Sequence, residues 1–213
     1  MPPPTPSPSP SAETIASYDL TAEAYHERWA DRTVLAPELA RFVALVNGLD
    51  APAPWVVDVG CGPGYDAAAL QAAGLRVIGV DLSAGMLRAG RRRYSVPLVQ
   101  GDMCALPLRA GAAGLWASAS LHHLPRRLVP SALASFVRVL RPGGWLFLSL
   151  RGGSGSGWQP LADDPERRRF FTYWSLEVLQ PLLNGAGLTA MELLAEEEGE
   201  KAWLSLFAQR QAP

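Results

Sequence analysis

Short apolar runs alternate with segments of helical periodicity along most of the chain. From residue 55 onwards, five compact runs are bounded by glycine or polar residues, and we predict a strand for each: 55–60, 75–80, 96–100, 115–119 and 145–150. The spacing of apolar residues predicts helices between them, over 66–73, 84–93 and 130–140. Strands that are apolar almost throughout and alternate with helices indicate a parallel sheet covered on both faces.

The beginning of the chain follows a different pattern. Residues 1–12 are mostly proline and serine, which neither pair nor bury apolar surface, so a disordered tail is predicted there. Residues 13–50 have helical spacing and form a predicted helical cap. Within this cap Pro37 suits the first turn of a second helix, and Asn47 with Gly48 suits its end.

After residue 151 the alternation of strands and helices stops. Residues 152–157 predict a flexible glycine-rich loop, residues 170–174 form a short aromatic segment, and residues 176–183 predict a helix. Two strand-like runs, 189–194 and 202–208, are separated by an acidic turn and should pair antiparallel. The predicted fold class is therefore α/β: a Rossmann-like, doubly wound sheet of seven strands, mostly parallel, with an antiparallel C-terminal hairpin and a helical N-terminal cap. We expect a single domain over 13–213, with its core over 54–213.

Composition and charge narrow the class of protein. The 213 residues are 48% hydrophobic and 18% charged, with a net charge of −1, which excludes wholesale disorder and a strong bulk attraction to nucleic acid or anionic membranes. Cys61 and Cys104 are too few for a disulfide framework or a four-cysteine zinc site, so no metal is expected. Neither a bilayer-spanning run nor a secretory signal is recognised. A reduced, soluble, cytoplasmic protein is expected.

The junction after the first predicted strand carries the strongest chemical signal. Glycines at positions 60, 62 and 64 let the chain turn sharply and let a ligand approach the backbone near a helix N-terminus. A dinucleotide loop needs G-x-G-x-x-G, but here the third glycine comes one position early and Tyr65 stands in its place. Asp58 in the strand and Asp66 at the helix start both disfavour a pyrophosphate. The pattern therefore favours a cationic, nucleoside-like ligand.

This junction resembles motif I of the class I S-adenosylmethionine-dependent methyltransferases, an acidic residue followed by G-x-G-x-G. The resemblance runs from about Ser17 to the C-terminus, is strongest over 56–153, and is closest to the small members grouped as types 11 and 25. It implies S-adenosyl-L-methionine as the cofactor. The turn Arg141-Pro142-Gly143-Gly144 also matches the family and is expected to be structural. One departure is the stretch 112–114, Ala-Ala-Gly, where the family often has an acidic residue.

The resemblance also implies roles for individual residues. The loop from Gly60 to Gly64 would pass under the amino acid part of the cofactor, Asp81 would accept hydrogen bonds from the ribose hydroxyls, and Leu82 with Met86 would pack on the adenine. Asp102 and the Met103 N–H would read the adenine edge, Ser118 would contact the methionine portion, and Tyr18 with Tyr25 would close over the site. The implied cofactor-binding set is Tyr18, Tyr25, Asp58, Gly60, Cys61, Gly62, Gly64, Asp81, Leu82, Met86, Asp102, Met103 and Ser118.

Methyl transfer from a sulfonium needs no catalytic side chain, since alignment alone supplies up to about 7–11 kcal/mol. A base would add about 10²–10⁴-fold for an O–H or N–H acceptor. His122 and His123 are the candidates, and the alternative is that one packs and the other caps the next helix. Arg151, Trp158 and Tyr173 are candidates for binding the substrate, and the alternative for this aromatic region is a strand of the core.

The sequence thus predicts an S-adenosylmethionine-dependent methyltransferase that acts on a small-molecule acceptor, as a monomer or homodimer, without a membrane partner. The charge balance and the lack of an added recognition domain disfavour nucleic acid. Three alternatives stay open: a non-catalytic protein that binds S-adenosylmethionine or a nucleotide, a nicotinamide-dependent enzyme, and a methyltransferase that acts on a macromolecule.

Overall fold

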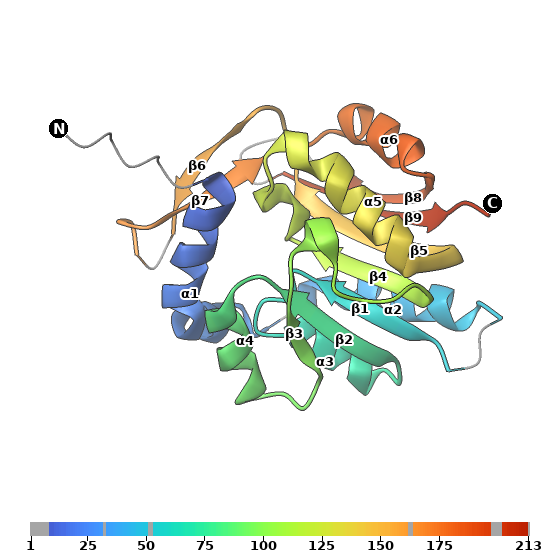
Figure 1. Ribbon diagram of the computed structural model, residues 1–213, viewed down its shortest axis with the longest axis horizontal. Helices are drawn as coiled ribbons and strands as arrows, with labels where there is room; N and C mark the ends of the chain where they lie inside the picture. The colour runs from blue at the N-terminus through green and yellow to red at the C-terminus, as the bar shows by residue number, and fades with distance from the viewer. Residues whose placement is uncertain (1–8, 32, 51–52, 162–163, 197–201, 213) are drawn as a thin grey trace.

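The computed structural model describes residues 9–31, 33–50, 53–161, 164–196 and 202–212. Its main sheet has seven strands in the order β3-β2-β1-β4-β5-β9-β8, and the β5–β9 and β8–β9 pairs are antiparallel (Figure 1). The strands are β1 (Trp55–Val59), β2 (Arg76–Asp81), β3 (Leu98–Gln100), β4 (Ala112–Ser118), β5 (Leu140–Arg151), β8 (Leu188–Glu196) and β9 (Trp203–Arg210). The predicted mostly parallel, Rossmann-like sheet with a C-terminal hairpin is confirmed.

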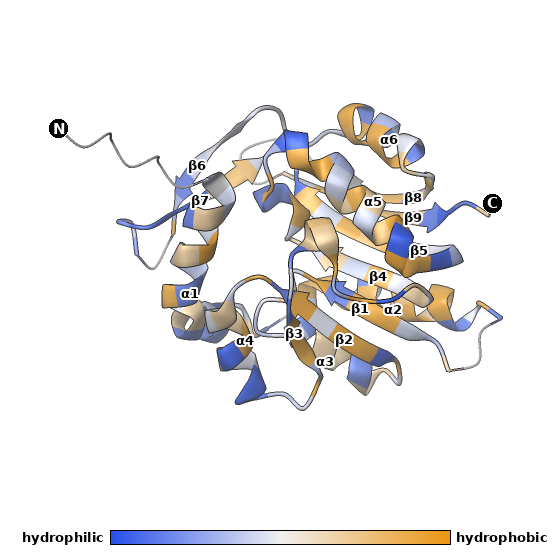
Figure 2. Cartoon of the chain, in the orientation of Figure 1, coloured by the Kyte–Doolittle hydropathy of each residue, from blue (hydrophilic) through white to orange (hydrophobic). Residues whose placement is uncertain are grey.

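Helices cover both faces of the sheet and enclose two apolar cores. The helices are α1 (Pro10–Trp29), α2 (Ala36–Asn47), α3 (Tyr65–Ala72), α4 (Ala84–Arg91), α5 (Val129–Val139) and α6 (Leu176–Gly185). One core packs α5 and α6 on the sheet through residues such as Phe136 and Leu179. The other packs α2 and α3 on the opposite face through Phe42 and Leu70. Figure 2 shows this apolar lining along the inner strands. The apolar runs of the sequence are therefore the buried centre of a three-layer fold.

The departure at 112–114 has a packing reason. Gly114 lies in β4, where a Cβ would come within 2.6 Å of the Phe42 ring. The ring of Phe42 in turn packs edge-on against Trp116, which stacks on Phe147 at 3.9 Å between centroids. Glycine at 114 thus lets α2 approach the sheet closely, and the position is a structural one.

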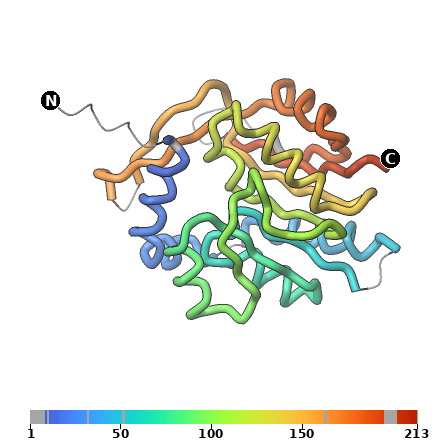
Figure 3. The backbone as a smooth tube through the Cα atoms, in the orientation of Figure 1, coloured from blue at the N-terminus to red at the C-terminus, as the bar shows by residue number. Residues whose placement is uncertain are grey.

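Helix α1 begins earlier than the sequence suggests. Ser9 caps it by accepting a hydrogen bond from the Ala12 N–H, and Pro10 fits the first turn because its missing N–H would have no partner there. Residues 10–12 are therefore helical, whereas residues 1–8 of the predicted tail lie outside the described residues. Helix α1 packs against α4 and β7 instead of lying on the main sheet, as Figure 3 makes clear.

Two further regions differ from the prediction. The predicted glycine-rich loop ends in a strand, because β6 (Ser156–Pro160) pairs antiparallel with β7 (Arg168–Thr172) in a separate two-stranded sheet. The turn from Arg141 to Gly144 lies inside an irregular start of β5, where the register against β4 shifts. Both regions are shaped by glycines with positive φ, Gly153 and Gly155 in one and Gly143 in the other.

Candidate functional site

The carboxyl ends of β1, β2, β3 and β4 surround a pocket that α1 covers from one side. In an α/β sheet this edge is where ligands bind. The lining residues are Ser11, Thr14, Ile15, Tyr18, Tyr25, Gly60, Gly62, Val80, Asp81, Leu82, Met86, Gly101, Asp102, Met103, Ala119, Ser120, His123 and Leu124. None of these described lining residues is lysine or arginine, so the wall offers carboxylates and apolar groups but no cation for a pyrophosphate.

The glycine loop forms the floor of this pocket in a shape that needs glycine. Gly60, Gly62 and Gly64 have φ of 69°, 55° and 88°, which L side chains rarely adopt. The N–H groups of Gly60 and Cys61 donate to the Val80 carbonyl at 2.7 and 3.1 Å, which fastens the loop to the end of β2. Because a Cβ at Gly62 would meet no atom within 4 Å, this residue leaves its side of the pocket open to a ligand.

Asp81 ends β2 and is held rigidly at the pocket wall. Its Oδ2 accepts from the Gly62 N–H at 2.8 Å, and its Oδ1 accepts from the Ser83 N–H at 2.8 Å. Burial raises the pKa of the Asp81 carboxyl, and these backbone hydrogen bonds oppose that rise. A carboxylate has about four acceptor positions, so Asp81 can still accept from a hydroxyl of a ligand in the pocket.

The next wall combines apolar side chains with a second carboxylate. Leu82 and Met86 follow β2, and Met103 follows β3. Asp102 precedes a short 3₁₀ turn, Met103–Ala105, and its Oδ1 accepts from the Cys104 N–H at 2.8 Å. This wall can pack on a flat heterocycle and read its polar edge.

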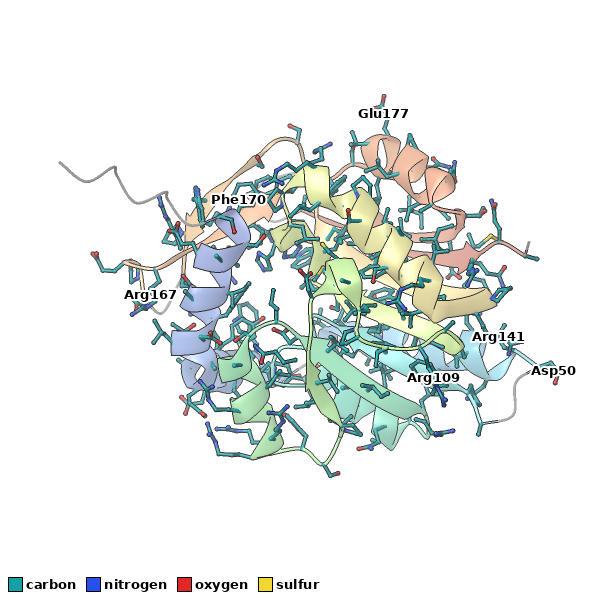
Figure 4. The ribbon with its side chains drawn as sticks, in the orientation of Figure 1. Asp50, Arg109, Arg141, Arg167, Phe170 and Glu177 are labelled. Carbon is teal, nitrogen blue, oxygen red and sulfur yellow. The ribbon has the colours of Figure 1, made fainter. Side chains whose placement is uncertain are left out.

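Helix α1 is fastened across the pocket at two places. On one side the Asp19 Oδ1 accepts from the Ser83 hydroxyl at 2.6 Å and from the Gly85 N–H at 2.7 Å. On the other side the Thr14 Oγ1 accepts from the Phe170 N–H at 3.0 Å, and the Ser17 hydroxyl donates to the Arg168 carbonyl at 2.8 Å. Figure 4 labels Phe170 in β7, beside the first turns of α1.

The hydroxyl of Tyr18 meets two side chains at the pocket. Its oxygen lies 2.9 Å from the His123 Nε2, and the Arg169 guanidinium donates to it at 3.1 Å. The Nδ1 of His123 lies 2.8 Å from the Phe170 carbonyl. Burial lowers the pKa of His123 to about 4 and raises the pKa of Tyr18, so both groups are uncharged near neutral pH.

Ten of the residues singled out from the sequence line the pocket: Tyr18, Tyr25, Gly60, Gly62, Asp81, Leu82, Met86, Asp102, Met103 and His123. Four of the predicted cofactor-binding residues do not. Asp58 is buried in β1, and Gly64 packs near Leu98 at the start of α3. Cys61 belongs to the core on the α3 face, where burial raises its thiol pKa well above the usual value. Ser118 ends β4, one residue before the lining begins at Ala119.

His122 and the predicted substrate residues also lie outside the pocket lining. His122 is buried against the ring of Phe171, and its Nδ1 accepts from the Arg151 N–H at 3.2 Å. The Arg151 guanidinium lies over the Trp203 ring. Trp158 faces Phe170 across the β6–β7 sheet, and the Tyr173 hydroxyl accepts from Gln159. A substrate role for Arg151, Trp158 and Tyr173 stays a prediction.

Sequence reasoning missed eight lining residues: Ser11, Thr14, Ile15, Val80, Gly101, Ala119, Ser120 and Leu124. The Ser120 hydroxyl donates to the Val59 carbonyl at 2.7 Å, so it supports the end of β1. Gly101 could have been found from the sequence, because it directly precedes the predicted residue Asp102. For the residues of α1 no local signal exists, because their exposure to the pocket depends on how the helix docks.

Replacing His123 with asparagine is expected to flatten the acid side of the stability profile. Unfolded histidine titrates near 6.5 and folded His123 near 4, so between these values the unfolded chain binds the extra proton and stability falls as the pH falls. At pH 5 this loss amounts to about 2 kcal/mol. Thermal unfolding of both proteins from pH 7.5 to 5 measures it. His122 and His26 are present in both proteins, so a difference between the two plots of stability against pH comes from His123. If the two plots run parallel, the assignment of this pH dependence to His123 is wrong.

Comparison with known proteins agrees with this geometry. Residues 56–144 match a family model described as a methyltransferase domain. A malonyl-[acyl-carrier protein] O-methyltransferase of Serratia marcescens is 36% identical over 126 residues, which cover 56% of this chain and 48% of that protein. A trans-aconitate 2-methyltransferase of Paracidovorax citrulli is 37% identical over 135 residues, covering 60% and 48%. The chain thus matches about half the length of these curated relatives.

Solved structures share the fold over nearly the whole chain. A 1,6-didemethyltoxoflavin-N1-methyltransferase of Burkholderia thailandensis superposes with a TM-score of 0.74 at 22% identity, covering 99% of this chain and 94% of that one. The CcbJ methyltransferase of Streptomyces caelestis gives 0.73 at 22% identity, covering 94% and 99%. The chain therefore shares the fold of these methyltransferases, and its residues 56–144, which include the glycine loop and Asp81, match the methyltransferase-domain model. No helix among the described residues is long and apolar enough to cross a membrane.

Proposed function

We propose that this protein transfers a methyl group from S-adenosyl-L-methionine to a small-molecule acceptor. The observation that carries the proposal is the pocket at the carboxyl ends of β1–β3, where an open glycine loop meets two carboxylates and an apolar wall. When bound, S-adenosylmethionine supplies an electrophilic methyl group on a positively charged sulfur. A pocket without lining lysine or arginine suits such a cation better than it suits a dinucleotide.

We assign three binding roles to the residues of the pocket. Asp81 has acceptor positions for the ribose hydroxyls, and its two backbone hydrogen bonds keep it oriented. Leu82, Met86 and Met103 would sandwich the adenine, with Asp102 at its polar edge. The glycine loop would pass under the amino acid part. Tyr18 and Tyr25, on α1, would exclude water from the reacting centre, with residues 13–50 acting as the cap of a single domain.

A small acceptor follows from the cover that α1 provides. Helix α1 is fastened on both sides of the pocket and contributes to its lining, and this partial cover favours a small acceptor over a macromolecular surface. Relatives named for trans-aconitate and demethylmenaquinone fit this size, whereas the name malonyl-[acyl-carrier protein] O-methyltransferase describes a small group carried on a protein. We therefore propose that the methylated group itself is small.

Isothermal titration calorimetry with S-adenosylmethionine, S-adenosylhomocysteine and NAD tests the cofactor. We expect one site per chain for the first two and no heat of binding with NAD; the reverse result would favour a nicotinamide-dependent enzyme. Incubation with methyl-labelled S-adenosylmethionine and a panel of small hydroxyl, amine and carboxylate compounds then tests transfer. Good cofactor binding without any labelled product across that panel would favour a non-catalytic binding protein.

A further inference from the structure

The Tyr18 hydroxyl is held in one orientation by its two partners. Nδ1 of His123 lies 2.8 Å from the Phe170 carbonyl, which can only accept, so Nδ1 carries the imidazole proton. His123 is uncharged, since burial and the Arg169 guanidinium both keep its pKa low. Its Nε2 is therefore an acceptor, and the Tyr18 hydroxyl must donate to it across 2.9 Å.

This orientation leaves one position on the phenol oxygen for a ligand. A tyrosine oxygen has two lone pairs, and the Arg169 guanidinium occupies one of them at 3.1 Å. Tyr18 lines the pocket, as do Thr14, Ile15 and Leu124, so its hydroxyl oxygen borders the space that a ligand would occupy. The remaining lone pair can accept a hydrogen bond, and the hydroxyl cannot donate one without leaving His123.

We propose that Tyr18 accepts the hydrogen of the methyl acceptor's O–H or N–H group and passes its own proton to His123. The inference rests on the proposed function and narrows its substrate class to uncharged hydroxyl or amine compounds that still carry a hydrogen on the reacting atom. Tyr18 is then the catalytic residue, and His123, which acts through it, is the positioning residue and holds the proton only transiently, because its low pKa favours release.

The step balances in atoms and charge. A lone pair of the acceptor's oxygen or nitrogen forms the new bond to the methyl carbon, and the pair of the broken carbon–sulfur bond stays on sulfur. The acceptor's proton moves to the Tyr18 oxygen while the Tyr18 proton moves to the His123 Nε2. The imidazolium so formed takes up the positive charge that the sulfur loses, so the net charge of the site is unchanged.

Burial, and after it the Arg169 guanidinium, keeps the pKa of His123 low, and other titratable groups also face the Tyr18–His123 pair. Arg169 on β7 faces the pair, His122 lies next to His123 with ring centroids 4.5 Å apart, and Asp81 is the carboxylate whose charge reaches Tyr18. Neutral His123 keeps its Nε2 as the acceptor of the Tyr18 hydroxyl over the whole physiological range. We therefore expect no loss of this function between pH 8 and 5.

Ligand binding tests the free lone pair without knowledge of the acceptor. Sinefungin carries an amine at the position of the transferred methyl, whereas S-adenosylhomocysteine has no group there. We expect the wild-type protein to bind sinefungin about tenfold more tightly than S-adenosylhomocysteine, the size of one good hydrogen bond. Tyr18→Phe should remove this preference and leave the affinity for S-adenosylhomocysteine within about twofold.

Ser17→Ala is the matched control. It removes a hydrogen bond between α1 and β7, as Tyr18→Phe does, but leaves the Tyr18–His123 contact in place. We expect it to keep the preference for sinefungin. An unchanged preference in Tyr18→Phe would overturn the proposal and leave Tyr18 as a fastener of α1. If wild-type protein binds neither ligand, the proposed function itself fails.

His123→Asn tests the second half of the relay. The asparagine amide can still donate to the Phe170 carbonyl but no longer reaches Tyr18. We expect this variant to retain binding of S-adenosylhomocysteine and to lose the preference for sinefungin, because the Tyr18 hydroxyl is no longer held. ¹⁵N NMR of the wild-type imidazole should show the proton on Nδ1 of His123 from pH 8 to 5. A proton on Nε2 would contradict the proposed direction of transfer.

Discussion

Asp81→Asn is expected to weaken the binding of S-adenosylhomocysteine about 10–100-fold. Both Asp81 oxygens accept backbone N–H groups, from Gly62 and from Ser83. An asparagine amide has one oxygen, so its NH₂ group would face one of these donors and leave a buried N–H without a partner, besides losing an acceptor for the ligand. Leaving such groups unsatisfied costs about 1–3 kcal/mol.

Calorimetric titration of the folded variant measures this loss. Asp66→Asn is a suitable control, because Asp66 is also a buried carboxylate but bonds the Trp116 indole on the α3 face, outside the pocket lining. Its affinity for S-adenosylhomocysteine should stay near that of the wild type. Equal affinities in Asp81→Asn and Asp66→Asn would remove Asp81 from the binding site.

Gly60→Ala is expected to lower the free energy of unfolding by about 2–5 kcal/mol and to abolish ligand binding. Its φ of 69° costs an L residue about 1–2 kcal/mol. A Cβ there would also overlap the Cβ of Ser120 and lie 2.9 Å from its Oγ, and overpacking of this kind costs about 1–3 kcal/mol. The loop would have to move away from the Val80 carbonyl that fastens it.

Gly62→Ala separates backbone strain from overlap. Its φ of 55° is also positive, but a Cβ would have open space around it. We expect this variant to lose only about 1–2 kcal/mol. Guanidinium unfolding of the two variants gives both values. A loss in Gly62→Ala as large as that in Gly60→Ala would mean that packing against Ser120 has no part in the effect.

Most of the sheet could be predicted because each strand is recognisable from its own residues, without knowledge of tertiary contacts. Trp55–Val59 and Arg76–Asp81 are mostly apolar runs that end at glycine or aspartate, and nearly all of their residues are buried or partly buried, as in a sheet covered on both faces. The β6–β7 sheet was missed because Ser156–Pro160 has neither apolar character nor a regular pattern. Its pairing with Arg168–Thr172 depends on tertiary contacts, including those that α1 makes with β7.

The site likewise has one part that the sequence predicts and another that depends on tertiary contacts. Gly60, Asp81 and Asp102 lie at or within two residues of the carboxyl ends of strands, so topology alone brings them to one edge of the sheet. Cys61 stands among them in sequence, yet its side chain points to the core, because neighbouring residues of a turn face different ways. Thr14 and Ile15 line the pocket only through the docking of α1, which no spacing in the sequence specifies.

The anchorage of α1 through Asp19 has a thermodynamic corollary. Asp19 is bonded to Ser83 and Gly85, and Ser83 is also bonded to Asp81. Ligand occupancy and helix docking therefore share one short stretch of backbone, and linkage makes their influence mutual. If docking of α1 raises the affinity for the ligand by some factor, bound ligand must raise the docking equilibrium constant of α1 by the same factor. Hydrogen exchange in α1 should therefore slow by that factor when the protein is saturated with ligand.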